Sequence, residues 1–334
     1  MTMRSGFLDA TPAYLGNKRR LCPLIFALIE EQLPRQSWAA SRFLDPFCGS
    51  CAVALYAKTG GFQVSASDVS ELAATTARAL VANSHVRLQQ EDVLALFADG
   101  HKNSEGVAAR QVRAAFSEQE AGFLDRVLAA ARERPEPKRS LLLLAITKLV
   151  LRLRPMSLLT ASDAGAAIVG DYDRVSPRRL GHYLRARQLL SPDALWAVAQ
   201  EVNKGVFGGR GEAGRGDAIE FLVGESGEVV YLDPPYPGTS DYRGAYGLLD
   251  ELLGGERVSL PAPTLDDLLG ASRHIPLLVL SYGGPGVDLD GLVSRVGRHR
   301  PVLRALAVPY PHLPSIASEE KNARNQEFIV VAGS

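Results

Sequence analysis

The strongest constraint on the fold is an alternation of short apolar runs and helix-like segments between residues 43 and 82. Phe43-Leu44 leads into the turn DPFCGSC, which the helix-like AVALYAKTG follows. A second apolar run, 62–66, ends at Ser67-Asp68 and precedes an Ala-rich helix expected over 71–82. Such alternation is typical of βαβ units, in which helices cover a parallel sheet. The sequence therefore predicts an α/β chain with a doubly wound sheet.

The same pattern resumes near the end of the chain, with apolar runs at 229–232, 275–280 and 327–332. The stretch between the halves is different, because it is rich in Ala, Leu and Arg at helical spacing and is broken by prolines. We expect residues 1–94 and 206–334 to build the sheet domain and residues 95–205 to form a mostly helical insertion. The glycine-rich GGRGEAGRG, at 208–216, is predicted to be a flexible loop.

Charge is balanced over the whole chain but not within the insertion. Lys and Arg together number 37, as do Asp and Glu, yet twelve basic residues face five acidic ones between Arg132 and Arg187. Ser176-Pro177 is a good helix start, after which Arg178, His182 and Arg185 share one helix face. This basic surface is either an ordinary solvated one or a place for phosphate contacts.

Composition and the cysteines narrow the class of protein. The N-terminal segment lacks an apolar signal core, and the longest apolar stretch, Leu141 to Ile146, is too short to cross a bilayer, so we predict a cytoplasmic protein with no membrane association. Three cysteines are too few for a disulfide framework. Cys48 and Cys51 form a CxxC, but neither a second CxxC nor a close His pair completes a zinc site. We expect small buried thiols and no metal.

Acidic residues stand at the ends of the expected strands. Asp45, Asp68 and Asp233 each follow an apolar run, and ligands of doubly wound sheets bind beyond the carboxyl ends of the strands. Asp68 is placed where an acid can accept hydrogen bonds from ribose hydroxyls. The turn after the first run has Gly49 but carries Cys51 where a second glycine is expected, so it is a poor dinucleotide motif.

The segment Asp233-Pro234-Pro235-Tyr236 ends the third run. Two prolines remove two backbone donors, so a strand cannot continue through them. Taken alone, the segment is equally well a rigid turn.

Four motifs in order resemble one family. They are Tyr14-Leu15-Gly16-Asn17-Lys18, Asp45-Pro46-Phe47-x-Gly49, Asp68 and Asp233-Pro234-Pro235-Tyr236, and the chain resembles the D12-class, Dam-like N6 adenine-specific DNA methyltransferases over 10–85 and 214–332. The resemblance implies a class I methyltransferase fold, with a Rossmann-like sheet and S-adenosyl-L-methionine as cofactor. It also implies transfer to N6 of adenine in double-stranded DNA, by base flipping and direct displacement. The helical insertion lies where that class carries its target-recognition region.

The resemblance also assigns cofactor residues. Tyr14 and Lys18 would lie near the methionine carboxylate, and Asp68 would hold the ribose hydroxyls. The turn formed by Asp45, Pro46, Phe47 and Gly49 would cradle the methionine and ribose.

For the acid that reads the cofactor's adenine, Asp217 is preferred to Asp92, because only a short helix separates Asp217 from the next strand; the choice stays open. The chain departs from the class at Ala218, where some members have an aromatic ring, and at Cys51, which replaces a frequent glycine and should crowd the cofactor slightly.

On the substrate side, the resemblance points to the DPPY segment. The Asp233 carboxylate and the Pro234 carbonyl would accept the two hydrogens of the target amine, Pro235 would stiffen the segment, and Tyr236 would stack on the flipped base. DNA phosphates are expected to contact four basic side chains: Arg178, Arg185, Lys321 and Arg324.

Other functions stay open at this stage. An N4-cytosine methyltransferase usually has Ser before the prolines, an RNA adenine methyltransferase shares the chemistry, and a catalytically silent DNA-binding module could keep the fold. The target sequence, a restriction endonuclease partner and the choice between monomer and dimer are not determined by the sequence.

Overall fold

The structure is a computed structural model that describes residues 5–14, 16–98, 106–110, 115–153, 177, 181, 187–236, 242–255, 263–284, 286–309 and 326–334. The chain forms two compact units. One contains the sheet and comprises Tyr14–Ser84, Gly208–Tyr242 and Val258–Ser334. The other is helical and comprises Met1–Ala13, His85–Phe207 and Arg243–Arg257. We call them the sheet unit and the helical unit.

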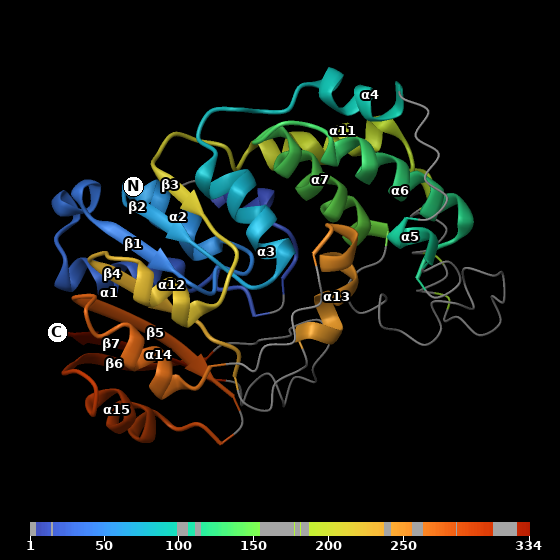
Figure 1. The fold of residues 1–334 in the computed structure, drawn as a ribbon. Helices are drawn as coiled ribbons and strands as arrows, with labels where there is room; N and C mark the ends of the chain where they lie inside the picture. Colours follow the sequence, from blue (N-terminus) through green and yellow to red (C-terminus); the bar gives the residue numbers. More distant parts are fainter. Residues whose placement is uncertain are drawn as a thin grey trace. The chain divides into compact units, whose positions relative to one another are not determined.

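The sheet has seven strands in the order β3-β2-β1-β4-β5-β7-β6 (Figure 1). Their bounds are β1 Arg42–Asp45, β2 Gln63–Ala66, β3 Gly211–Ala213, β4 Val229–Leu232, β5 Leu277–Gly283, β6 Val302–Pro309 and β7 Gln326–Gly333. The strands β3, β2, β1, β4 and β5 run parallel to one another. β7 lies between β5 and β6 and is antiparallel to both. The strand order reverses between β1 and β4, since β2 and β3 lie on one side of β1 and the later strands on the other. This is the switch point at which such sheets bind ligands.

Successive side chains of β1 bury opposite faces of the sheet. The Phe43 ring lies 5.6 Å from that of Phe26 in α1, within an aromatic cluster that includes Trp38 and Phe62. Leu44 belongs to the apolar core on the other face, which α12, α14 and α15 cover. Helices therefore cover both faces, which confirms the predicted doubly wound α/β class. The helices of this unit are α1 Cys22–Gln32, η2 Arg35–Ala40, α2 Ala52–Gly60, α3 Glu71–Thr76, η3 Ala77–Ala82, α12 Ala218–Gly224, α14 Leu265–Ala271 and α15 Leu289–Gly297.

The helical unit is built around α7, whose side chains are buried almost all round. Its elements are η1 Ser5–Ala10, α4 Gln90–Ala98, α5 Val107–Arg110, α6 Glu118–Arg132, α7 Lys138–Leu153, η5 Arg187–Leu189 and α11 Pro192–Asn203, and it takes in most of α13 Tyr242–Leu252. Ser117 and Glu120 form a capping box at the start of α6. The Lys148 ammonium in α7 donates to the Asp9 and Thr11 carbonyls at 2.6 and 3.1 Å, which joins the N-terminal segment to this unit. Within the described parts of the chain, no helix is both long and apolar enough to cross a membrane.

The prediction of a flexible loop over 208–216 is wrong at its centre. Gly211–Ala213 forms β3, which pairs with β2. A Cβ at Gly211 would lie 2.4 Å from the Val81 carbonyl oxygen, so glycine is needed here for close packing against η3. The helix expected over 71–82 is α3 followed by the single-turn π-helix η3.

Candidate active site

Asp233 is the first residue after β4, at the switch point. The carboxylate is largely buried, with 19% of the side chain exposed. The Tyr236 hydroxyl lies 2.9 Å from Asp233 Oδ1 and also within hydrogen-bond distance of Glu327 Oε1. The Tyr236 ring packs edge-on against Tyr282, with 5.3 Å between ring centroids. The DPPY segment therefore ends in a ring that is held at both its hydroxyl and its edge.

Lys18 joins this cluster from the segment before α1. Its side chain is 4% exposed, and its Nζ lies 3.0 Å from Asp233 Oδ1 and 3.5 Å from Glu327 Oε1. Nζ also donates to the Gly16 carbonyl at 3.1 Å and lies 5.2 Å from the Tyr236 ring centroid. The ammonium has three hydrogens, and these three oxygens can accept all of them. The predicted contact of Lys18 with a methionine carboxylate would require it to exchange a partner, and it stays a prediction.

Glu327 is the member of the cluster that the sequence reasoning missed. It lies in β7, its side chain is fully buried, and its Oε1 accepts a hydrogen bond from the Ser281 hydroxyl of β5 at 2.8 Å. The signal available in the sequence was an acid inside an apolar strand, since buried carboxylates are rare unless they are paired.

Burial and nearby charges shift the pKa values of Asp233 and Tyr236. Burial raises the pKa of Asp233 above its ordinary value; Lys18 lowers it, and the negative charge of Glu327 raises it further. Burial and the two carboxylates raise the pKa of Tyr236 well above its ordinary value. Tyr236 therefore stays a hydroxyl, and its one hydrogen serves one carboxylate at a time.

The turn after β1 offers a buried acceptor and a close backbone. Asp45 is buried, and its Oδ1 has no hydrogen-bond partner among the described residues. Burial, followed by the charges of Asp233 and Asp68, raises the pKa of Asp45 well above its ordinary value. Gly49 has a φ of 46°, and a Cβ there would lie 3.0 Å from the Tyr14 ring. The structure thus brings Tyr14 and the Asp45–Gly49 turn together.

Asp68 holds two loops in place. Its Oδ2 accepts from the Gly49 N–H and its Oδ1 from the Ser70 N–H, both at 3.0 Å. It therefore fastens the turn after β1 to the start of α3. Each carboxylate oxygen has a second acceptor position, so its predicted role toward ribose is compatible with these contacts and stays a prediction.

The two candidates for reading adenine lie in different units. Asp217 caps α12 beyond β3 in the sheet unit, and its Oδ1 accepts from the Ile219 and Glu220 N–H groups at 2.8 and 3.2 Å. Asp92 lies in the helical unit and pairs with Lys138 at 2.6 Å. The position favours Asp217. The prediction that the strand before Asp217 lies next to β4 is wrong, because β2 and β1 separate β3 from β4.

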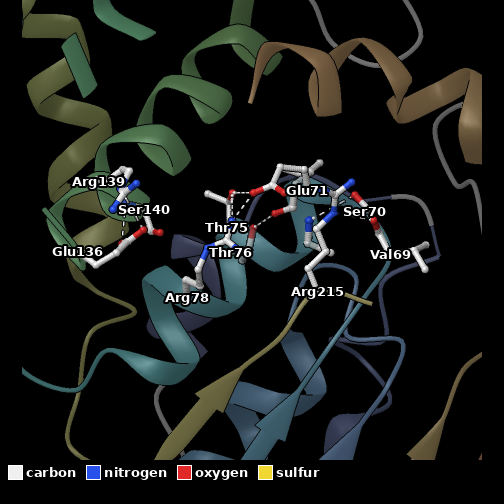
Figure 2. Close-up of polar contacts among 12 residues, drawn as sticks. Val69, Ser70, Glu71, Thr75, Thr76, Arg78, Glu136, Arg139, Ser140 and Arg215 are labelled. Carbon is white, nitrogen blue, oxygen red and sulfur yellow. Dashed lines mark hydrogen bonds and ion pairs between the residues drawn. The ribbon is translucent and has the colours of Figure 1, made fainter. Parts of the chain in front are cut away.

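Arg215, two residues before Asp217, connects the loop after β3 to the loop after β2 (Figure 2). Arg215 pairs with Glu71 at 3.1 Å and donates from Nε to the Val69 carbonyl at 3.1 Å. The Gly216 N–H donates to the Asp68 carbonyl at 3.2 Å. The loop after β3 is therefore bound to the loop after β2. Glu71 also pairs with Arg78, which comes from the same α3–η3 segment.

The three cysteines are free and buried, which confirms the prediction of small buried thiols. Cys51 is left-handed, with a φ of 60°, a conformation that costs a side chain about 1–2 kcal/mol and that glycine adopts freely. Its Sγ lies 3.8 Å from the Ala73 carbonyl oxygen in α3. Burial is the main reason that the pKa of Cys51 is raised, so the group is a thiol at neutral pH. Within the part of the chain that the structure describes, His, Cys, Asp and Glu side chains do not gather in groups of three or more that could hold a metal ion.

Four predicted phosphate contacts lie outside the described residues: Arg178, Arg185, Lys321 and Arg324.

Known proteins are similar to this chain in sequence. The chain is 26% identical over 343 aligned residues to "Type II methyltransferase M2.HphI" of Haemophilus parahaemolyticus, covering 95% of each protein. A solved structure, the rRNA methyltransferase aviRa from Streptomyces viridochromogenes, aligns over 99% of this chain and 94% of that one, at 15% identity and a TM-score of 0.36.

The sequence profile described as "D12 class N6 adenine-specific DNA methyltransferase" matches residues 14–253. This match begins at Tyr14 and runs through the acids of the sheet edge to the DPPY segment. The seven-stranded sheet is the class I methyltransferase fold, and the chain belongs to the D12 class of N6 adenine-specific DNA methyltransferases.

Proposed function

We propose that this adenine-specific DNA methyltransferase takes its methyl group from S-adenosylmethionine and acts at Asp233 on an adenine turned out of double-stranded DNA. The observation that carries the proposal is the largely buried Asp233 carboxylate at the switch point, held between Lys18 and Tyr236. A carboxylate fixed in this way is a preorganised partner for the charge that develops on an attacking amine.

The residues along the ends of β1, β2 and β3 fit the cofactor. The buried Oδ1 of Asp45 has no hydrogen-bond partner among the described residues, and the positive φ at Gly49 lets the turn approach a ligand closely. We assign Pro46, Phe47 and Tyr14 to the methionine side, Asp68 to the ribose hydroxyls, and Asp217 with Ala218 to the adenine. When bound, S-adenosylmethionine supplies an electrophilic methyl group on its sulfonium.

The DPPY segment fits the target base. The Asp233 carboxylate and Pro234 carbonyl accept the two N6 hydrogens, which directs the nitrogen lone pair at the methyl carbon. Pro235 limits the motion of this carbonyl, and the Tyr236 ring offers a stacking face. An amine paired inside a duplex cannot reach the largely buried Asp233 carboxylate, so the base must flip out.

The helical unit would carry target recognition, with phosphate contacts from Arg178 and Arg185. Lys321 and Arg324, which precede β7 in the sheet unit, would add two further phosphate contacts. The Haemophilus relative is named a Type II methyltransferase. This name favours a modification role beside a restriction endonuclease for this chain as well.

The test pairs DNA from cells that express the wild type with DNA from cells that express Asp233→Ala. Long-read sequencing should find N6-methyladenine in one sequence context with the wild type and none with the variant. In single-turnover assays, Asp233→Ala should lower the methylation rate at least about a hundredfold, the effect of removing one preorganised electrostatic partner. Cofactor affinity should change far less, because other residues hold the cofactor.

The control is Asp290→Ala, an exposed acid in the first turn of α15, which should behave as the wild type does. N4-methylcytosine in place of N6-methyladenine would refute the assigned target. Near-normal turnover by Asp233→Ala would mean that the DPPY segment is only a turn.

A further inference from the structure

We propose that Glu327 is a positioning residue for methyl transfer, which holds the Tyr236 hydroxyl and the Lys18 ammonium and, through them, the Asp233 carboxylate. The inference rests on the proposed role of Asp233. Glu327 itself is fully buried, so it acts through these side chains and not by touching the base.

Glu327 lies in a buried strand that pairs on both of its sides. Its strand, β7, lies between β5 and β6, and the carboxylate accepts a hydrogen bond from Ser281 of β5. Both β5 and β7 are buried along nearly their whole length. The carboxylate is thus a fixed point against which the less regular DPPY segment can be held.

The first group that Glu327 holds is the Tyr236 hydroxyl, which lies between Glu327 Oε1 and Asp233 Oδ1. With the hydroxyl held and the ring edge against Tyr282, the ring face is set before the base arrives. A preorganised stacking surface loses less conformational freedom on binding.

The second group is Lys18, whose Nζ lies between the two carboxylates at 3.0 and 3.5 Å. Glu327 therefore shares the ammonium with Asp233. If Glu327 were neutral, Lys18 would pair with Asp233 more fully, and Asp233 would be a weaker acceptor for the target amine.

The cluster contains opposing charges that make this idea testable. Lys18 comes from the segment before α1, Asp233 and Tyr236 from the end of β4, Tyr231 from β4 itself and Ser281 from β5. The charge of Glu327 raises the pKa of Asp233, and that of Lys18 lowers it. Asp233 must be ionised to accept the amine hydrogens, so its pKa sets the acid limb of the rate profile.

The experiment compares Glu327→Gln with the wild type in single-turnover methylation across pH. Glutamine keeps the size and an acceptor oxygen but removes the charge. We expect the rate to fall about tenfold or more, the scale for a hydrogen bond to a charged group. We also expect the acid limb to move to lower pH, because Asp233 no longer has a repelling neighbour. Lys18→Met should move the limb to higher pH, and the cofactor dissociation constant of Glu327→Gln should stay within about twofold of the wild type.

The matched control is Glu120→Gln, another buried glutamate, which caps α6 in the helical unit. It should leave rate and pH profile unchanged. Should Glu327→Gln fail to fold, Tyr236→Phe carries the test, since it removes the hydroxyl and keeps the ring; a lowered rate at unchanged cofactor affinity supports the inference.

A rate within twofold and an unmoved acid limb in Glu327→Gln would overturn the inference, as would a fully active Tyr236→Phe. An active wild type with unaffected variants refutes the role of Glu327 alone. A wild type that leaves DNA unmethylated refutes the proposed function, and the inference falls with it.

Discussion

The Asp68 carboxylate fastens two loops of the fold, and we propose that it also holds a ligand. Its two oxygens accept backbone N–H groups from Gly49 and Ser70, and the same oxygens are proposed to accept ribose hydroxyls. A substitution at this residue should therefore reduce both stability and cofactor affinity, and the two effects must be measured separately.

We predict that Asp68→Ala raises the cofactor dissociation constant by roughly 1.5–3 kcal/mol in free energy, the range for hydrogen bonds to a charged group. Asp92→Ala should leave it nearly unchanged, because Asp92 pairs with Lys138 in the helical unit. Calorimetric titration of the cofactor would measure affinity, and thermal unfolding of the same variants would measure the structural part. The opposite ranking of the two variants would show that ribose is held elsewhere.

At the same scale, the sequence reveals some site residues and hides others. Asp45, Asp68 and Asp233 follow apolar runs directly, so their place at the sheet edge can be read along the chain. Glu327 lies near Asp233 because β7 pairs with β5. The two segments are far apart in the sequence, so no local pattern predicts this pairing. Lys18 was found, but its contact with Asp233 depends on the same tertiary arrangement.

Among the elements, the loops after β2 and β3 form one connected structure. Arg215 reaches from the second loop to Glu71 and the Val69 carbonyl (Figure 2). These loops carry Asp68 and Asp217, the acids assigned to ribose and adenine. Their spacing decides whether one adenosine can contact both.

We predict that Arg215→Ala weakens cofactor binding about threefold to thirtyfold, since it removes one charge-assisted tie that orders both loops. Arg78→Ala is the matched control: Arg78 also pairs with Glu71 and is equally exposed, at 31% against 30%, but it does not reach the loop after β3. Calorimetric titration of the cofactor should show weaker binding by Arg215→Ala than by Arg78→Ala. Equal effects of both variants would mean that only the charge balance of Glu71 matters.

The strands inside the sheet were predicted well, and the two edge strands, β3 and β6, were not. The core strands β1, β2, β4, β5 and β7 follow their runs closely. The edge strand β3 was taken for a loop, because clustered glycines indicate flexibility locally, whereas Gly211 is needed for contact with η3. The strand β6 was not predicted, although its sequence contains the apolar run 305–308; it lies at the edge of the sheet and none of its side chains is buried.

Over the whole molecule, the structure divides the basic charge of the insertion into two groups. Of the twelve basic residues between Arg132 and Arg187, six have side chains that the structure describes, and all six have partners inside the helical unit. Arg132, Arg134 and Lys148 donate to backbone carbonyls, while Lys138, Arg139 and Arg152 pair with carboxylates. The charge between Arg132 and Arg152 thus contributes to the stability of this unit. The basic residues from Arg154 to Arg187 become the better candidates for DNA phosphates.

We therefore predict that neutralising Arg178 and Arg185 together, as Gln, weakens DNA binding for all sequences alike and lowers the salt slope by about two units, one for each phosphate that its arginine no longer neutralises. The control replaces Arg139 and Arg152 by Gln; this removes the same charge from side chains that already pair with Glu136 and Glu201. Because those pairs are internal, the control should leave the slope almost unchanged, although it can lower the melting temperature. Binding would be measured by fluorescence anisotropy on duplexes with and without the target sequence, between about 50 and 200 mM salt. If the control lowers the slope as much as the test variant, net charge alone attracts the DNA and no phosphate contact can be assigned to these two arginines. If neither variant changes it, Arg178 and Arg185 do not contact DNA phosphates, and the prediction is wrong.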